Sequence, residues 1–297
     1  MLLNGSLRTN KTQVLVNRYV ELINSGVKPD EILVINLNKY KNQCFIENAR
    51  KLINDKNLDT KLIQTFYGLC YNALKDNWDY IQSQIRTGKN TQQPNLCGLE
   101  VSQYIFAQSI KGNIFKDYLS KVNLFHQLFK RYSLIVQNDL LNSEIEEKSK
   151  ILKETFFSDT QKALDFYRRK TLEYRSFDYL RQIAAFKNIY NNTDYFKKVK
   201  YLFIDDADEI TYAVFEFINY LKPQLKDWAI AYDTFGSSRC GYLSAYRKSV
   251  DKFEEIFNDK PQKLTANDKI SCMAQRLYLN IQKDVEARHG QADSAAV

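Results

Sequence analysis

An apolar run that ends in carboxylates is the feature of this chain with the clearest chemical meaning. Residues 199–204 are mostly apolar, and Asp205, Asp206, Asp208 and Glu209 follow at once. Such a run is typical of a central strand of a parallel sheet, which is buried on both faces. The acids would then stand at the carboxyl edge, where a divalent cation carrying polyphosphate would neutralise them. The alternative is a solvated acidic turn after a core strand.

A second group of candidate residues lies near the start of the chain. The phosphate-loop pattern GxxxxGK[ST] fits this segment at Gly5, Lys11 and Thr12. In such a loop backbone N–H groups cradle phosphate oxygens, the lysine reaches the β and γ phosphates, and the hydroxyl coordinates Mg²⁺. Asn10 replaces the second glycine, and asparagine tolerates a positive φ, although its side chain would crowd the phosphates. The pattern indicates Mg-ATP binding, and a chance match is the alternative.

Strands and helices that could position these groups alternate along the chain. Apolar strands are predicted at 31–35, 61–64 and 227–233 in addition to the acidic one, and a helix follows each of the first two. Residues 1–3 are too short for a complete strand unless the chain begins further upstream. The alternation is typical of an α/β protein with a parallel sheet and ligand-binding loops at one edge.

Composition limits the classes of function. The 297 residues carry a net charge of +8, which favours a polyanionic partner, although a solvated lysine surface would give the same balance. The five cysteines are scattered and only two histidines are present, so neither a disulfide framework nor a zinc site is supported. No signal peptide and no apolar run near 18 residues is visible, and we expect a cytoplasmic protein.

The middle of the chain combines aromatic and basic residues. Residues 78–175 are compatible with helices throughout, except for a predicted loop at 86–98 that is rich in Gly, Asn, Gln and Pro. Lysines that follow phosphates and rings that stack on bases would suit single-stranded nucleic acid. Amphipathic helices with aromatic side chains inward are the alternative, and for most of these residues they are the better interpretation.

The order of these segments resembles the first motor domain of superfamily 1 DNA helicases of the UvrD, PcrA and Rep type. In that family a phosphate loop is followed by the phrases TFTNkAA and TFHsfc, an inserted helical subdomain, and the phrases DFdDLL and VDEfQDtn. Here the segments 30–39, 65–70, 176–180 and 201–210 have similar spacing. The resemblance covers roughly residues 2–280. It implies a P-loop NTPase with a RecA-like parallel sheet flanked by helices and an inserted all-helical subdomain.

The resemblance also implies domain boundaries. The ATP-binding motor domain would comprise residues 1–80 and 176–283, and the inserted helical subdomain would comprise residues 81–175 and lie beside the DNA track. Residues 284–297 differ in composition from the rest, and we expect them to be a disordered tail.

Roles for individual residues follow from the resemblance as well. Asp205 and Thr12 would hold Mg²⁺, while Asp206 would stand where the family has the glutamate that orients or deprotonates the attacking water. Lys11 would share the catalytic role. The nucleotide-binding residues would be Gly5, Asn10, Lys11, Thr12 and Lys269. The DNA-binding residues would be Asn38, Lys39, Thr65, Phe66 and Tyr67.

Three departures from the family pattern predict low turnover. Asp206 is one methylene shorter than glutamate, Gly236 replaces a glutamine that senses the γ phosphate, and Lys269 lacks the bidentate fork of the arginine it replaces. The second motor domain of the family is also missing. We therefore expect a UvrD-like ATP-binding domain that binds Mg-ATP and single-stranded DNA and hydrolyses ATP weakly, or only with a second motor domain on another chain. The alternative is a degenerate, non-catalytic module that binds nucleotide or DNA.

Overall fold

The computed structural model describes most of the chain, and all statements below refer to the part that it describes. The described residues are 1–6, 9–83, 93–109, 121–151, 157–234, 236, 245–246, 248–265, 277, 280–281 and 283. Two predictions lie outside these residues, namely the disordered tail at 284–297 and the nucleotide contact of Lys269.

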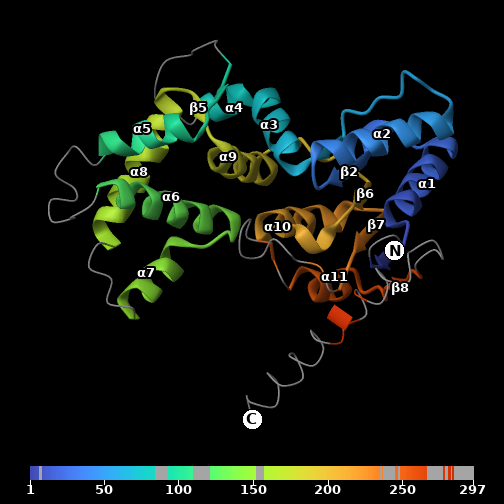
Figure 1. The fold of residues 1–297 in the computed structure, drawn as a ribbon. Helices are drawn as coiled ribbons and strands as arrows, with labels where there is room; N and C mark the ends of the chain where they lie inside the picture. The colour runs from blue at the N-terminus through green and yellow to red at the C-terminus, as the bar shows by residue number, and fades with distance from the viewer. Residues whose placement is uncertain are drawn as a thin grey trace.

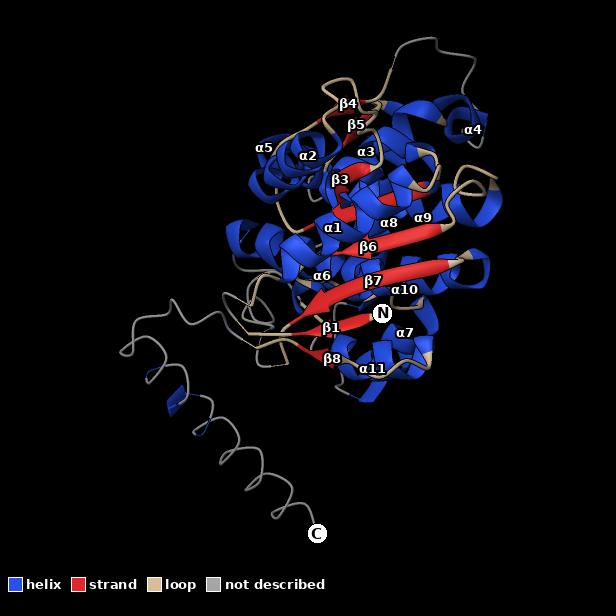
Figure 2. Cartoon of the chain, turned by 90° about the vertical axis from the view of Figure 1, so that its right-hand side faces the viewer, coloured by secondary structure: helices blue, strands red, loops and turns tan. Residues whose placement is uncertain are grey.

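A six-stranded sheet forms the centre of the molecule, and every pairing in it is parallel. Its strand order is β3-β2-β6-β7-β1-β8 (Figure 2). The strands are β1 (Leu2–Asn4), β2 (Ile32–Asn36), β3 (Ile63–Thr65), β6 (Tyr201–Ile204), β7 (Asp227–Tyr232) and β8 (Gln262–Lys263). The predicted α/β fold with a parallel sheet is confirmed. The three residues of β1 do form a strand, because β7 and β8 pair with them on both sides.

Helices follow the strands and also form a separate group away from the sheet (Figure 1). Short 3-10 turns lie at Pro29–Glu31, Ala207–Glu209 and Lys222–Gln224. The helices are α1 (Lys11–Asn24), α2 (Lys39–Ile53), α3 (Phe66–Asp76), α4 (Trp78–Ser83), α5 (Leu99–Ser109), α6 (Lys121–Gln137), α7 (Asn142–Ile151), α8 (Phe157–Glu173), α9 (Tyr179–Asn192), α10 (Tyr212–Leu221) and α11 (Ser249–Phe257). None of the described helices has the length and apolar character that crossing a membrane requires.

Alternate residues of the central strands feed two hydrophobic clusters on opposite faces of the sheet. Val34 and Phe203 pack with residues of α1 and α2. Leu33, Leu202 and Ile204 point the other way, into a cluster built with α3, α9, α10 and α11. This alternation is what a strand with helices on both faces requires, because successive side chains point to opposite sides.

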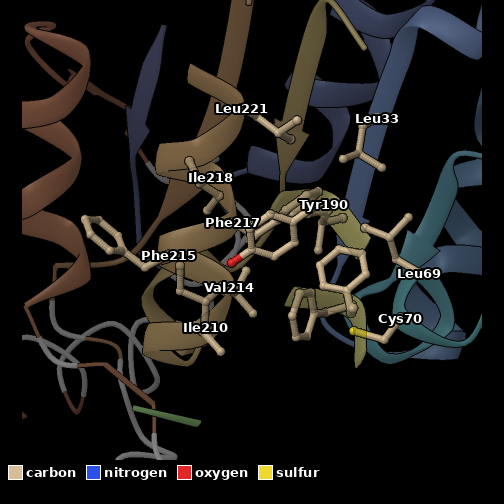
Figure 3. Packing of buried hydrophobic residues seen from close by; sticks show 14 of the residues in the cluster. Leu33, Leu69, Cys70, Tyr190, Ile210, Val214, Phe215, Phe217, Ile218 and Leu221 are labelled. Carbon is tan, nitrogen blue, oxygen red and sulfur yellow. The ribbon is translucent and has the colours of Figure 1, made fainter. Parts of the chain in front are cut away.

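Aromatic rings fill much of the larger cluster. Phe217 of α10 is fully buried, and its ring lies 4.7 Å from that of Phe186 and 5.2 Å from that of Tyr190, both on α9. Figure 3 shows Phe217 and Tyr190 facing each other beneath the strands. Ring contacts thereby pack helix α10 against helix α9.

The helices α5, α6 and α8 have a hydrophobic cluster of their own. Phe106 stacks on Tyr167 with ring centroids 4.0 Å apart, and Tyr132 meets Tyr167 edge-on. All three rings are buried, together with Phe125 and Leu128. For these residues the amphipathic interpretation is correct, since their aromatic side chains form a core instead of an exposed stacking surface.

A two-stranded pairing beside these helices was not predicted. Strand β4 (Asn95–Leu96) lies in the segment that the composition favours as a loop, and it pairs in parallel with β5 (Ser176–Phe177). The backbone N–H of Asn95 donates to the carbonyl of Arg175 at 2.7 Å. Two residues are too few for a periodic pattern, so only the tertiary pairing defines this strand.

Asp178 joins the helices α5, α8 and α9 through one buried carboxylate. It begins α9, where its Oδ1 accepts from the backbone N–H of Arg181 at 2.7 Å. Its Oδ2 accepts from Ser102 Oγ of α5 at 3.0 Å and from the phenol of Tyr167 in α8. The phenol is buried beside this carboxylate, and both burial and the negative charge raise the pKa of Tyr167.

We expect Asp178→Ala to lower the free energy of unfolding by about 2 kcal/mol, because it leaves buried donors without a charged acceptor. Asp165→Ala is the matched control, since Asp165 is exposed on α8 and its loss should cost less than about 0.5 kcal/mol. Urea denaturation followed by circular dichroism measures both. Equal losses for the two variants would contradict a joining role for Asp178.

Candidate functional site

The loop between β1 and α1 is closed by short contacts. The N–H of Gly5 donates to the carbonyl of Tyr232 at 3.0 Å, and Thr9 Oγ1 donates to the carbonyl of Ser6 at 2.8 Å. A Cβ atom at Gly5 would lie 2.3 Å from Thr9 Oγ1, so a larger residue at this position would displace Thr9. Glycine is therefore required here by close approach.

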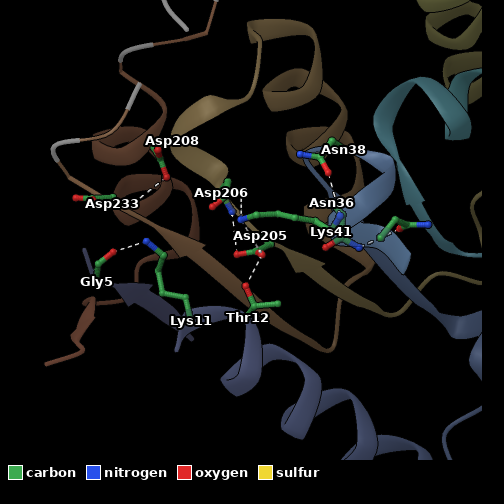
Figure 4. A network of polar contacts seen from close by, with 11 residues as sticks. Gly5, Lys11, Thr12, Asn36, Asn38, Lys41, Asp205, Asp206, Asp208 and Asp233 are labelled. Carbon is green, nitrogen blue, oxygen red and sulfur yellow. Dashed lines mark hydrogen bonds and ion pairs between the residues drawn. The ribbon is translucent and has the colours of Figure 1, made fainter. Parts of the chain in front are cut away.

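Asn10 adopts the left-handed conformation, with φ 60° and ψ 26°. This is the positive φ that its type was expected to tolerate in place of glycine. Asn10 precedes α1 without capping it through its side chain. The next residue, Lys11, folds back so that its Nζ donates to the carbonyl of Gly5 (Figure 4). The ammonium group of Lys11 thus lies beside Gly5 near the N-terminus of a helix, a position that favours anions.

Thr12 and Asp205 meet although 193 positions separate them in the chain. Thr12 Oγ1 donates to Asp205 Oδ2 at 2.6 Å. Thr12 lies in the first turn of α1, and Asp205 follows the last residue of β6. Both strands that lead to these residues run parallel, so their carboxyl ends meet at one edge of the sheet. Asp205 is 2% exposed and its carboxylate points into this edge.

Asp206 turns sharply at the end of β6 and meets a lysine that sequence reasoning left without a role. Its backbone is left-handed, with φ 52°. Lys41 Nζ contacts Asp206 Oδ2 closely and lies 3.5 Å from Asp205 Oδ2 (Figure 4). The only sequence signal was that Lys41 follows β2, whose carboxyl end lies at the same edge as that of β6.

Burial and neighbouring opposite charges shift the pKa values of Asp205 and Lys41 in opposite directions. Burial, and then the charge of Asp206, raise the pKa of Asp205, while Lys41 and Thr12 oppose that shift. Burial alone would lower the pKa of Lys41, but the two carboxylates outweigh it and raise that pKa. The three charges sum to −1 at neutral pH when all are ionised, so the edge can still attract a cation.

The oxygen atoms at this edge of the sheet fit Mg²⁺ that is bound together with a phosphate ligand. Thr12, Asp205 and Asp206 supply oxygen atoms, which Mg²⁺ prefers. Among the described residues no group of three or more His, Cys, Asp and Glu side chains could hold a metal by itself. Mg²⁺ commonly keeps several waters and is bound by one or two carboxylates together with substrate phosphates. The residues therefore fit a metal that arrives with a phosphate ligand.

The remaining acids and Gly236 form a separate group beside this edge. Asp208 Oδ1 accepts from the N–H of Asp233 at 2.9 Å, and the N–H of Gly236 donates to the carbonyl of Asp233 at 2.9 Å. A Cβ atom at Gly236 would lie 1.9 Å from Asp208 Oδ2 and 3.0 Å from its Cβ. The position where the family has its sensing glutamine is thus closed to a side chain unless Asp208 moves.

The five residues expected to bind DNA occupy two kinds of environment. Asn38 caps α2 by accepting from the N–H of Lys41 at 2.9 Å, and Thr65 caps α3 by accepting from the N–H of Gly68 at 3.1 Å. Phe66 is buried, and its ring packs 5.5 Å from that of Phe186. Asn38, Lys39 and Tyr67 are exposed to solvent, and Thr65 is partly exposed.

A small cavity connects the exposed tyrosine to the acids. Its volume is about 80 Å³, and Tyr67 and Phe66 lie on one side of it. Asp205, Asp206 and Glu209 also line it.

The sheet order, the loop after β1 and the acid at the end of β6 together define a nucleotide-binding domain of the P-loop NTPase class. Comparison with known families gives the particular one. The family model of the UvrD/REP helicase N-terminal domain matches residues 5–233, and the chain belongs to this family. The predicted resemblance is thereby confirmed. No curated protein matches the chain.

Proposed function

We propose that this protein binds Mg-ATP and single-stranded DNA as the ATP-binding domain of a UvrD-like helicase. The observation that carries the proposal is the contact of Thr12 with Asp205 at 2.6 Å, beside the loop that holds Lys11. A hydroxyl and a carboxylate in contact at the mouth of a phosphate loop are the pair that would hold Mg²⁺ on a nucleotide. We also propose a cytoplasmic location, because the protein would meet both proposed ligands, ATP and single-stranded DNA, in that compartment.

Each residue of the edge would have a separate task. Lys11 would leave the carbonyl of Gly5 and bind the β and γ phosphates, while the N-terminus of α1 would bind the same anion through its N–H groups. Asp205 and Thr12 would hold Mg²⁺, which when bound neutralises charge on the phosphates. Asp206 would orient the attacking water, and its contact with Lys41 argues that hydrolysis is weak.

Lys11→Ala is expected to weaken Mg-ATP binding at least about tenfold, because the charge that faces the phosphates is lost. Calorimetric titration with a non-hydrolysable ATP analogue measures the affinity. Lys51→Ala is the matched control, since Lys51 is exposed at the far end of α2 and its loss should leave the affinity unchanged. Equal affinity in the wild type and Lys11→Ala would contradict a phosphate-binding role for the loop.

A non-catalytic binding module is the second candidate, and two observations favour it. Asp206 is engaged by Lys41, and Asp208 fills the space next to Gly236. Both would impair hydrolysis while leaving Lys11 and Thr12 able to bind nucleotide. Addition of a second motor domain to the turnover assay distinguishes the two candidates, because it should raise hydrolysis by an ATP-binding motor domain and leave a non-catalytic module unchanged.

A further inference from the structure

Lys41 is a cation built into the acidic edge of the sheet. Its Nζ lies between the carboxylates of Asp205 and Asp206 and contacts both. We propose that Lys41 is a tethered counter-cation that competes with a divalent metal for this pair of carboxylates. The inference rests on the proposed function, because it takes Asp205 and Thr12 as the ligands of that metal.

The geometry argues for competition because one oxygen atom is shared. Asp205 Oδ2 accepts from Thr12 Oγ1 and is also the Asp205 oxygen that Lys41 Nζ contacts, at 3.5 Å. A metal bound to the threonine and aspartate oxygens would therefore lie close to the ammonium group. Two cations at that separation repel each other strongly in a site that is largely shielded from water. Either the metal or Lys41 can hold the carboxylates, but not both in the arrangement that the structure shows.

The lysine is held in place by its helix. Lys41 lies in the first turn of α2, where its backbone N–H donates to Asn38 Oδ1 at 2.9 Å. Its side chain is 33% exposed, and those of Asp205 and Asp206 are 0% and 19% exposed. A charge pair with this degree of burial is stronger than an ion pair on the surface, because water screens it less.

A consequence follows for the order in which ligands bind. Without nucleotide the carboxylates already have a cation, so a divalent metal gains little by displacing it. The phosphates of a nucleotide supply new oxygen ligands to the metal and a new partner to Lys41. Metal and nucleotide should then bind cooperatively, each raising the affinity for the other by the same factor.

Titration with Mn²⁺ in the absence of nucleotide tests the competition. Electron paramagnetic resonance of free Mn²⁺ gives the dissociation constant. Lys41→Ala is expected to bind Mn²⁺ about tenfold more tightly than the wild type, since an opposing charge has been removed. Lys51→Ala is the control on the same helix and should bind Mn²⁺ like the wild type. Asp205→Ala lacks a proposed metal ligand and should not show the tighter Mn²⁺ binding expected of Lys41→Ala. Equal or weaker binding by Lys41→Ala would overturn the proposal.

Two further variants separate the loss of charge from the loss of side-chain length and from misfolding. Lys41→Met keeps the length of the side chain without its charge, so it should also bind Mn²⁺ more tightly, even if Lys41→Ala folds poorly. Lys41→Arg keeps the charge and should bind as weakly as the wild type. Because no nucleotide is present, these outcomes do not depend on whether the loop at Lys11 binds ATP. Failure of the proposed function would instead appear in the ATP titration of Lys11→Ala.

Discussion

Raising the salt concentration from about 50 to about 200 mM is expected to weaken binding of single-stranded DNA by about 10² to 10³, if about six phosphates are contacted. The physical reason is release of counterions from the DNA, which salt opposes. The net charge of +8 and the absence of any base-reading motif in the sequence favour this kind of binding. Fluorescence anisotropy of a labelled oligonucleotide at several salt concentrations gives the slope. A flat salt dependence would show that the basic residues form only a solvated surface.

Two variants locate that binding on the molecule. Lys39→Ala should reduce the slope by about 0.7, the contribution of one phosphate contact on a single strand. Tyr67→Ala should lower affinity at every salt concentration by about 1–3 kcal/mol, the contribution of one stacked base. Tyr104→Ala probes a second element, because Tyr104 is an exposed tyrosine on α5, in the segment expected beside the DNA track. If Tyr67→Ala leaves the affinity unchanged, the DNA surface is not at α3, and a loss in Tyr104→Ala alone would place it at α5.

Much of the fold could be predicted from local pattern. The apolar run before Asp205 specified β6, the segments at 31–35 and 61–64 contain most of β2 and of β3, and the segment at 227–233 contains all of β7. β2 and β6 lie inside the sheet and are buried on both faces, so their sequences are apolar at nearly every position. The helix after the phosphate loop was visible for the same reason, since its apolar residues recur at helical spacing.

Phe66 shows where two kinds of inference disagreed. The resemblance assigned it to DNA, but Phe66, Leu69, Cys70 and Ala73 recur at the spacing of one helix face, and all four are buried. That periodicity predicts a core residue. Tyr67, one position later, points away from the buried face and remains exposed. Of the two rings, Tyr67 is therefore the exposed one, and a DNA contact at either residue stays a prediction.

Contacts between distant elements could not be read from the chain. Lys41 reaches Asp206 across 165 positions, and Ser102 reaches Asp178 across 76. The local sequence around Lys41 or Ser102 does not indicate which distant carboxylate each will contact. The choice of partner depends on the order of the strands and on side-chain length, and only the folded structure fixes both.

Gly236 illustrates the same limit at the site. The sequence showed that glycine stands where the family has glutamine, which suggests restoring the glutamine to recover turnover. The structure places Asp208 in the space that such a side chain would need. Forcing a larger residue into a packed position costs about 1–3 kcal/mol. A variant at Gly236 would therefore test packing as well as catalysis, and Asp206 is the better position to change.

Asp206→Glu is expected to raise ATP turnover by up to about 100-fold when single-stranded DNA and a second motor domain are supplied. The longer side chain brings the carboxylate about 1 Å closer to the water in line with the γ phosphate, and a displacement of that size in a catalytic group can change the rate about a hundredfold. Steady-state phosphate release measures the effect, with Asp205→Ala as the blank.

Because Lys41 contacts Asp206, Asp206→Glu must also be measured in combination with Lys41→Ala. If the lysine holds the lengthened carboxylate as it holds the aspartate, Asp206→Glu will reach its full rate only when combined with Lys41→Ala. A rate that rises in the double variant and not in the single one would show that Lys41 limits the turnover. A rate that stays at the blank in both would assign it elsewhere. Asn10 would then be the first residue to examine, because its side chain lies in the phosphate loop where the family has none, and the non-catalytic module would be the better description.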